Sequence, residues 1–430
     1  MLSASSFSLM SRVHSTLWQR FTLGMLCVSP FFFPLYLLRF KVVGVPFTVL
    51  ELFTYLLFAA FLLGCLRGQF KLEWRGMKGY YVFALMLLLG SILGVVLAPH
   101  EIILPGGESI DPQMISMGVL KGWILAPLLY FFTLTQLVKN SIDLKKILLS
   151  FIASGALVAL VSYFFGIFGT GFTPDLRLAG VFESANYLSL YLAPAFLLGL
   201  YYLSQKDFLT KSERLLSVGG CTIMAHALFM SQSYAAILAI FGAIGFYVLR
   251  LLFRKRGNLK QFFGMLILLL ALLAGLIASQ FNTPKFQQFL DWENRSSTSV
   301  RLEIYQVSLT LIKDHPLTGI GPGLFQAYYQ TNAPLVLGQV PLEWNMPHPH
   351  NIFLAFWLNA GLLGFLAFLG FLFLAHRKFT YPLIAFWGIL IHGLFDVPFW
   401  KNDLAMIFWL ILGAIVVLQI QIHQEKKFTL

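Results

Sequence analysis

Long apolar runs alternate with short polar connectors along almost the whole chain. Most runs are about 20 residues long, the length that an α-helix needs to cross a hydrocarbon core of about 30 Å. No strand-like alternation competes with them. The pattern therefore predicts an all-α polytopic membrane protein of about twelve transmembrane helices. We place these spans at 21–38, 46–66, 79–98, 118–138, 147–168 and 187–203, in a run ending near 230, in a run after the turn 231–234, and at 262–281, 352–375, 382–399 and 404–422.

One long polar segment, 282–350, interrupts this pattern between the ninth and tenth spans. The other segments between spans are short, whereas this one contains helical periodicity, a glycine-rich run and two histidines. The chain shows no internal repeat and no appended soluble domain. We therefore expect residues 1–430 to form a single integral membrane domain, in which the 282–350 loop carries the active site.

The composition supports a membrane protein and explains the basic charge. The chain is 58% hydrophobic and 11% charged, whereas about 25% of residues are charged in soluble domains. A net charge of +12 would fit a nucleic-acid-binding protein, but most of the Lys and Arg residues lie in loops on one presumed side. The positive-inside rule places those loops in the cytoplasm and the 282–350 loop outside. We therefore expect no nucleic-acid partner.

The sequence SSTSVRLEIYQVSLTLIKDHP predicts a helix within the long loop, started by its Ser and Thr residues and stopped at His315. We place Arg301 in its first turn, where a cation opposes the helix dipole unless an anion lies nearby. A bound phosphate would resolve that conflict. The alternative is a surface ion pair of Arg301 with Glu303, Glu293 or Asp291.

The GIGPG run after this helix contains Gly319, Gly321 and Gly323. A dinucleotide-binding loop would need a preceding strand and a βαβ unit, and the sequence predicts neither. We interpret the run as a turn that lets two short helices pack closely, because glycine tolerates positive φ and proline fixes φ nearby.

The run MPHPHN places His348, His350 and Asn351 at the external membrane boundary. A neutral imidazole with an ordinary pKa near 6.5 suits a general base that activates a hydroxyl. A zinc site is an alternative, but the spacing across a proline and the absence of a nearby Cys argue against it. A histidine that merely caps the next helix is a second alternative. We predict no metal.

A third external segment, DLRLAGVFESAN, carries Arg177 just before the sixth span. Arg177 could be an interfacial anchor. It could instead form a two-arginine clamp with Arg301 for a diphosphate, since the planar guanidinium matches phosphate oxygens.

These motifs together resemble the O-antigen ligase and polymerase family of bacterial envelope glycosyltransferases. The resemblance rests on R-x-x-G-x-F from Arg177 to Phe182 followed by Asn186, on an arginine-led helix ending in PLTGIGPG, and on the pair His350 and Asn351 followed by GLLG. It covers roughly the second half of the chain and agrees with the family's number of spans. Two departures stand out: Tyr234 follows Ser233 where the family often has arginine, and Glu183, Ser184 and Ala185 replace its small residue, Asn and Pro.

The resemblance implies a GT-C-like fold and a glycan donor carried on a polyprenyl (undecaprenyl) diphosphate. Transfer to an acceptor hydroxyl would take place on the external face of the bacterial inner membrane, without a cofactor or metal. It further implies that Arg177 and Arg301 hold the diphosphate and that His350 deprotonates the acceptor. The implied supporting residues are His348, Asn351, Asn186 and Tyr234.

The acceptor stays open between a lipid A core sugar, as in a ligase, and a growing glycan, as in a repeat-unit polymerase. The chain ends soon after its last predicted span, so we do not expect a protein acceptor.

A function of another class, transport of a lipid-linked glycan, would use polar residues near the membrane midplane. The candidates for that role are Glu51, His226, His392 and Asp396. Glu51 and Asp396 lie near span ends and are interpreted mainly as structural partners or interfacial groups. Lys121 is expected to extend toward the external interface. Because the candidate catalytic residues Arg177, Arg301 and His350 are expected on the external face and not near the midplane, the sequence favours an enzyme.

Overall fold

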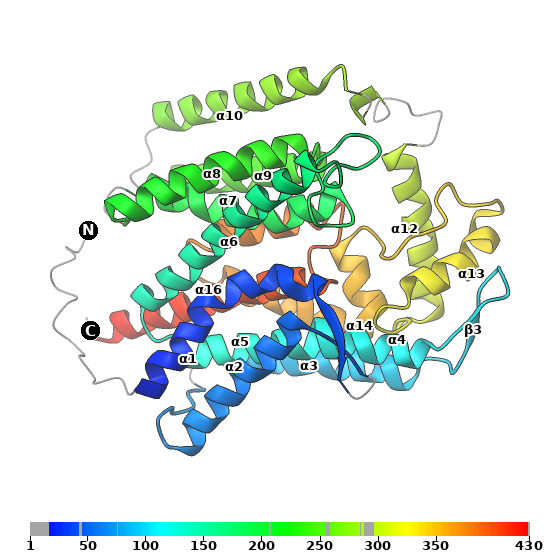
Figure 1. The fold of residues 1–430 in the computed structure, drawn as a ribbon, viewed down its shortest axis with the longest axis horizontal. Helices are drawn as coiled ribbons and strands as arrows, with labels where there is room; N and C mark the ends of the chain where they lie inside the picture. Colours follow the sequence, from blue (N-terminus) through cyan, green and yellow to red (C-terminus); the bar gives the residue numbers. More distant parts are fainter. Residues whose placement is uncertain are drawn as a thin grey trace.

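The computed structural model describes residues 17–42, 45–74, 76–205, 208–253, 259–283, 285–287 and 296–428. Helices account for most of them and lie side by side in one elongated bundle (Figure 1). In chain order the elements are α1 (Leu17–Val28), the 3-10 helix η2 (Ser29–Leu37), β1 (Arg39–Val42), β2 (Val45–Thr48), α2 (Val49–Leu66), α3 (Lys78–Val96), β3 (Ile102–Ile103), β4 (Ser109–Ile110), α4 (Pro112–Val119), the π-helix η3 (Leu120–Leu125), α5 (Ala126–Leu137), α6 (Ser141–Ile167), α7 (Ala185–Ser204), α8 (Lys211–Met230), α9 (Tyr234–Phe253), α10 (Leu259–Gln280), α12 (Ser297–Asp314), α13 (Phe325–Leu337), α14 (Ile352–His376), α15 (Leu383–His392) and α16 (Asn402–Phe428).

Ten helical segments in the described part of the chain are long and apolar enough to cross a membrane. This confirms the predicted all-α polytopic class. The two remaining predicted spans also form helices, but α8 begins with charged residues and α15 has only 10 residues. After α15 the chain continues through the non-helical segment 393–401 instead of completing a span. The predicted number of twelve is therefore replaced by ten long spans together with α8 and α15.

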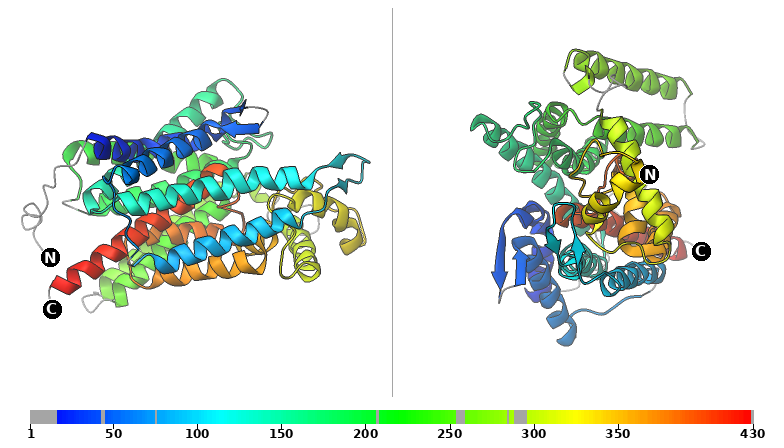
Figure 2. Two further views of the ribbon diagram at one scale, coloured as in Figure 1. Left: turned by 90° about the horizontal axis from the view of Figure 1, so that it is seen from below. Right: turned by 90° about the vertical axis from the view of Figure 1, so that its right-hand side faces the viewer.

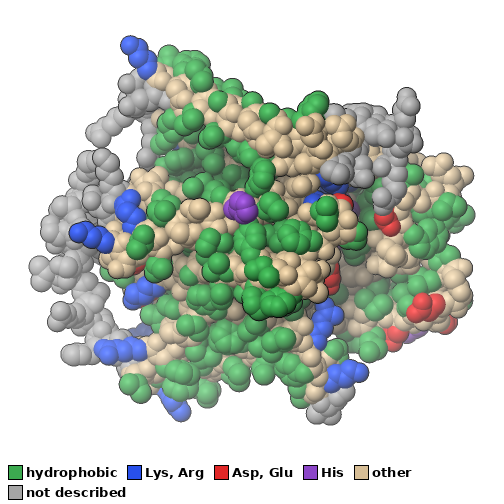
Figure 3. Space-filling view, turned by 45° about the horizontal axis from the view of Figure 1, so that its top comes forward, with side chains coloured by type: hydrophobic (Ala, Val, Ile, Leu, Met, Phe, Trp, Pro, Cys, Tyr) green, Lys and Arg blue, Asp and Glu red, His purple; other side chains and the backbone are tan. Residues whose placement is uncertain are grey.

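The core of the bundle lies around α16, whereas α10 lies at its edge. In the apolar window of α16, 72% of residues are buried, compared with 6% in that of α10. Helix α14 packs along α3, and α15 packs against α9 and α7. Apolar side chains cover the flank of the bundle, while Lys and Arg gather mainly toward the end where α16 finishes (Figure 3). An apolar flank is what a hydrocarbon environment requires.

Helices α12 and α13 and the β3–β4 hairpin lie beyond the spans at one end of the bundle (Figures 1 and 2). Helix α12 confirms the helix predicted in the long loop: Ser296 caps it through the Ser299 amide, and it ends before His315. The placement of Arg301 in the first turn was wrong. Arg301 comes five residues after the cap, in the second turn, where the helix dipole acts more weakly.

The glycine-rich run forms the turn between α12 and α13, as predicted. Gly319, Gly321 and Gly323 all have positive φ, at 64°, 98° and 78°. The turn also binds the backbone of α14, because the Ile320 amide donates to the Leu358 carbonyl at 2.8 Å. A Cβ at Gly319 would lie 2.3 Å from that carbonyl oxygen. The close approach that glycine permits therefore fixes the extramembrane helices onto α14.

Candidate active site

Two adjoining cavities lie where the segments that contain Arg177, Tyr234 and Arg301 meet. The first, of about 450 Å³, is largely apolar and is lined in part by Ala235, Leu238, Leu302, Leu394 and Phe395. The second, of about 290 Å³, is more polar and is lined in part by Asp175, Arg177, Glu343, Met346 and His350. Four residues line both cavities: Asn186, Lys285, Ser297 and Arg301. The structure thus brings Arg177 and Asn186, from one segment, together with Arg301 and His350 from distant parts of the sequence.

Three non-glycine residues in the described part of the chain have positive φ, and all three lie at these cavities or next to them. His350 has φ of 47° and lines the polar cavity, and Gln232 has φ of 48° and lines the apolar one. Leu176, with φ of 59°, precedes Arg177. Such conformations are costly and concentrate at functional sites.

The two histidines of the MPHPHN run face one buried carboxylate. His350 Nδ1 lies 3.5 Å from Asp396 Oδ1, and His348 Nε2 lies 3.8 Å from the same oxygen. The Tyr187 hydroxyl lies 3.1 Å from His348 Nε2. The Asp396 side chain is only 3% exposed, whereas that of His350 is 19% exposed. His350 can therefore reach a ligand in the polar cavity while Asp396 stays behind it.

The structure places Asp396 beside the candidate site residues His348 and His350. Asp396 had been interpreted mainly as a structural or interfacial group, but it lies in the segment 393–401, outside the candidate spans and beneath the histidines. Burial would raise the pKa of its carboxyl, but the neighbouring imidazoles of His350, His348 and His392 outweigh burial and lower that pKa below its ordinary value. The Val397 amide donates to Oδ1 at 2.8 Å. Asp396 is therefore a carboxylate at neutral pH.

The environment of His348 favours a neutral ring. Burial lowers the pKa of His348 to about 3; the neighbouring His350 and Lys401 also lower it, whereas Asp396 raises it. A neutral imidazole at this position can accept or donate a hydrogen bond but adds no positive charge to the site. His348 therefore suits a supporting role better than the holding of an anion.

Arg301 is positioned by backbone carbonyls. Its Nε donates to the Phe395 carbonyl and its Nη1 to the Ser297 carbonyl, both at 3.0 Å. It forms no ion pair within the described residues. Glu303 accepts from the Leu342 amide instead. The other two proposed partners, Asp291 and Glu293, lie outside the described residues, as does the neighbouring Arg295.

Segment 394–396 is held by the same loop and helix that supply the site. Tyr305 donates to the carbonyls of His350 and Leu394 at 3.1 and 3.0 Å. Asn351 caps α14 through its side-chain oxygen and donates to the Leu394 carbonyl at 3.3 Å. Arg301, His350 and Asp396 are therefore parts of one hydrogen-bonded unit.

Arg177 and Lys285 are further cations that line the polar cavity. Arg177 Nε lies 2.7 Å from Asp175 Oδ2, and Thr173 and Arg177 lower the pKa of Asp175 although burial would raise it. Lys285, which sequence reasoning missed, lines both cavities beside Arg301. Tyr234 lines the apolar cavity and packs edge-on against Phe286, the residue after Lys285. Lys285 thus places a cation near Tyr234, the position at which the family often has arginine.

His348, His350 and Asp396 also form a group with metal-ligand character, since their candidate ligand atoms all lie within 4.8 Å of one another. The sequence analysis considered only the two histidines as metal ligands, and the fold places the Asp396 carboxylate beside them. Three protein ligands are the number that a catalytic zinc site uses. The predicted absence of a metal therefore stays a prediction that needs its own test.

The family model described as O-antigen ligase matches residues 219–369. The matched range contains Tyr234, Lys285, Arg301, His348 and His350, whereas Arg177, Asn186 and Asp396 lie outside it. No curated protein gives a significant match to the chain. The match supports the family resemblance inferred from the motifs: residues 219–369 of this multi-pass membrane protein are similar to the O-antigen ligase family.

Proposed function

We propose that the protein is a membrane glycosyltransferase that moves a glycan from a polyprenyl diphosphate donor to an acceptor hydroxyl, on the external face of the bacterial inner membrane. The observation that carries the proposal is the pair of cavities that share Arg301, Lys285, Asn186 and Ser297. A polyprenyl diphosphate glycan has an apolar chain, an anionic centre and a polar glycan in the same order as the apolar cavity, the shared cations and the polar cavity.

The anionic centre of the donor fits the shared residues. Arg301 has two of its nitrogens donating to backbone carbonyls, which fixes the orientation of the guanidinium. Lys285 adds a second cation at the junction, and Arg177 adds a third at the polar cavity. Preorganised cations of this kind stabilise the charge that develops on a leaving diphosphate.

The acceptor chemistry fits His350. In the proposed step the acceptor oxygen attacks the anomeric carbon of the donor, the bond from that carbon to the diphosphate oxygen breaks, and the acceptor proton passes to His350 Nε2. Polyprenyl diphosphate leaves with the electron pair. Asp396, near Nδ1, favours the tautomer that leaves Nε2 free to accept a proton, and it stabilises the imidazolium that forms. The buried His348 and Tyr187 support the ring of His350 from behind.

The donor chemistry is the same for a ligase and for a polymerase. Ligation to a lipid A core sugar is the principal proposal, and repeat-unit polymerisation is the alternative. Supplying purified lipid A core and donor separately and together distinguishes them, because a polymerase lengthens the glycan without the core.

The structure gives less support to the transporter. Of its four candidate residues, Asp396 lies with His348 and His350, and the His392 carbonyl accepts from the Asp396 amide at 3.0 Å. Glu51 forms an ion pair with Lys121 at 3.0 Å. His226 lies against the Tyr163 hydroxyl at an exposed position. These contacts do not form a polar pathway near the middle of the bundle.

The test separates the roles of two residues in purified protein in lipid nanodiscs with a labelled polyprenyl diphosphate glycan. Arg301→Ala is expected to weaken donor binding, because it removes a cation from the shared junction. His350→Ala is expected to leave the donor bound and to slow transfer by about 10²- to 10⁴-fold, the usual effect of losing a general base. The matched controls are Lys313→Ala on the same helix and His100→Ala at an exposed position. Parental transfer by His350→Ala would refute the assignment of the base.

The external placement needs a separate test. Leu335 on α13 is 82% exposed, and in a variant without Cys27, Cys65 and Cys221 a Leu335→Cys change should react with an impermeant thiol reagent added outside. Lys71→Cys, at the opposite end of the bundle, should react only after the inner face is opened. The reverse pattern would overturn the proposed orientation.

A further inference from the structure

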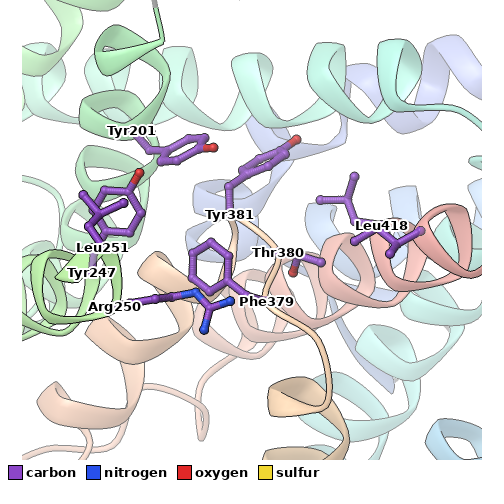
Figure 4. Close-up of a pocket in the computed structure, with 9 residues that line it drawn as sticks. Tyr201, Tyr247, Arg250, Leu251, Phe379, Thr380, Tyr381 and Leu418 are labelled. Carbon is purple, nitrogen blue, oxygen red and sulfur yellow. The ribbon is translucent and has the colours of Figure 1, made fainter. Parts of the chain in front are cut away.

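A second polar cavity lies at the end of the bundle opposite the candidate active site. Helices α7, α9, α14 and α16 all begin near that site and end around this cavity. Its volume is about 250 Å³, and its lining includes Tyr201, Tyr247, Arg250, Thr380 and Tyr381. Figure 4 shows these side chains converging from α7, α9 and the turn between α14 and α15. The proposed transfer reaction does not use this cavity.

The lining combines a cation, aromatic rings and an unsatisfied hydroxyl. The Arg250 guanidinium lies 4.1 Å from the centre of the Phe379 ring. Tyr201 and Tyr381 stack with ring centres 5.1 Å apart and an interplanar angle of 6°. Thr380 is only 4% exposed, and its Oγ1 has no hydrogen-bond partner among the described residues. A buried hydroxyl without a partner is uncommon, and this one borders a cavity large enough for a small polar group.

The position of the cavity along the bundle indicates that it lies at the membrane surface. Helix α7 ends at Ser204 and α14 at His376, so the cavity lies where the hydrocarbon core gives way to the headgroup region. Leu251, Leu418 and Ile422 form an apolar part of its wall. Arg377 and Lys378 follow α14 in the same turn. A polar pocket with a cation, an apolar wall and basic neighbours matches the headgroup and the upper acyl chains of an anionic lipid.

We propose that this cavity binds the phosphate-bearing headgroup of an anionic membrane phospholipid. Arg250 pairs with the phosphate, the Thr380 hydroxyl donates to a phosphate or glycerol oxygen, and the tyrosine rings enclose the headgroup. Helix carboxyl ends carry partial negative charge, which disfavours a bare anion. The apolar wall adds contacts that only a lipid with acyl chains can make, so the lipid binds and free phosphate does not.

The test measures the thermal midpoint of the full-length protein in detergent with added phosphatidylglycerol, phosphatidylcholine or inorganic phosphate. Phosphatidylglycerol is expected to raise the midpoint, and the other two are expected to leave it unchanged, since only a ligand bound to the folded state stabilises it. Arg250→Gln should weaken phosphatidylglycerol binding roughly tenfold, the usual effect of losing one charge-assisted hydrogen bond. Thr380→Val should weaken it less. The matched control is Arg377→Gln, which removes a neighbouring cation outside the cavity lining.

Each other outcome overturns the inference. An equal shift in Arg250→Gln, Thr380→Val and the parent would place the lipid elsewhere. An equal shift with phosphatidylcholine would remove the role of the anionic headgroup, and a shift with phosphate alone would make this a free-anion site. Should Arg250→Gln fail to fold, Thr380→Val and native mass spectrometry of retained lipid decide the question. Transfer activity is not read in this test, so failure of the proposed function leaves the result unaffected.

Discussion

Two clusters of charged side chains in the described part of the bundle differ in how completely their polar atoms are hydrogen-bonded. In the first, which we call the Glu51 cluster, Glu51, Lys121 and Asn402 join α2, η3 and the start of α16. Lys121 Nζ lies 3.0 Å from Glu51 Oε2 and also donates to the Pro46 carbonyl. Asn402 donates to Glu51 Oε1 at 3.3 Å and accepts from Trp123 at 2.8 Å. The polar atoms of this cluster have partners.

The second, the His350 cluster, consists of His348, His350, Asp396 and Lys401. Among the described residues, three of its buried nitrogen atoms have no hydrogen bond of good geometry: His348 Nδ1, His350 Nδ1 and Lys401 Nζ. Lys401 Nζ lies 3.4 Å from the centre of the Tyr187 ring and 3.7 Å from Glu183.

A complete polar network rigidifies the fold, whereas an incomplete one beside a cavity indicates groups kept for a ligand. The comparison therefore supports a structural role for the Glu51 cluster and the proposed catalytic role for the His350 cluster.

The substitution expected to have the largest effect on the His350 cluster is Asp396→Asn, which tests whether this cluster takes part in transfer. The substitution keeps the shape of the side chain but removes the negative charge beside His350 Nδ1. We expect transfer to fall by at least about tenfold, because the imidazolium that forms during the reaction loses its counter-charge. Donor binding should change little. Single-turnover transfer and donor binding in the same nanodiscs measure the two effects separately.

The fold of this variant is checked by its thermal midpoint, because the loss of a buried carboxylate can also destabilise the protein. Asp396→Glu retains the charge and should recover part of the rate. Asparagine at full parental rate would show that Asp396 is a structural partner, as the sequence had suggested.

A smaller effect is expected from Lys285→Gln. This substitution removes one of the two cations shared by both cavities. It should weaken donor binding roughly tenfold while leaving the rate of transfer from bound donor nearly unchanged. Lys285→Arg should preserve binding, and Lys313→Gln on α12 provides the matched control. Equal donor affinity in the parent and in Lys285→Gln would exclude Lys285 from the diphosphate site.

The Glu51 cluster should respond in the opposite way. Lys121→Met leaves the Glu51 carboxylate buried without its ion partner, and we expect the free energy of unfolding to fall by about 1–3 kcal/mol, since the lysine side chain is partly exposed. Transfer per folded molecule should stay at the parental level. Thermal midpoint and specific transfer rate provide the two readings. A lower transfer rate at an unchanged thermal midpoint would mean that the Glu51 cluster takes part in transfer, and the two clusters would then no longer differ in role.

Much of the fold could be predicted from periodicity, because spans and the helix in the long loop depend on local patterns. Helix α12 was predicted together with its end at His315, and the turn at Gly319, Gly321 and Gly323 has the expected positive φ. The error at α15 has a physical cause: the run 382–399 is apolar enough to suggest a complete span, but only α15 is helical and 393–401 is not. Hydropathy alone does not distinguish a buried irregular segment from a helix.

The site was predicted in part. The resemblance indicated Arg177, Arg301, His350 and Asn186, and the structure brings these residues to one pair of cavities. Asp396 was considered only as a transport, structural or interfacial residue and Lys285 was not singled out, because each belongs to a segment without a motif and reaches the candidate site only through tertiary packing. The one signal for Asp396 was an isolated acid after the apolar run of α15. Such a residue in an apolar surrounding is a candidate for function by default.

The smallest expected effect, no change at all, concerns metal removal. We expect transfer to be unchanged after treatment with a divalent-metal chelator, although His348, His350 and Asp396 form a possible ligand group. The Tyr187 hydroxyl lies 3.1 Å from His348 Nε2, the nitrogen that faces Asp396, so a metal would have to displace it. Asp396 Oδ1 already accepts from the Val397 amide, and the cations of the cavities can neutralise a leaving diphosphate without a metal. Transfer is measured before and after chelation, with added Zn²⁺, Mg²⁺ and Mn²⁺ in separate arms. Loss of transfer that one metal restores would turn His348 and His350 into ligands, and a metal-bound water or hydroxyl would then replace His350 as the base.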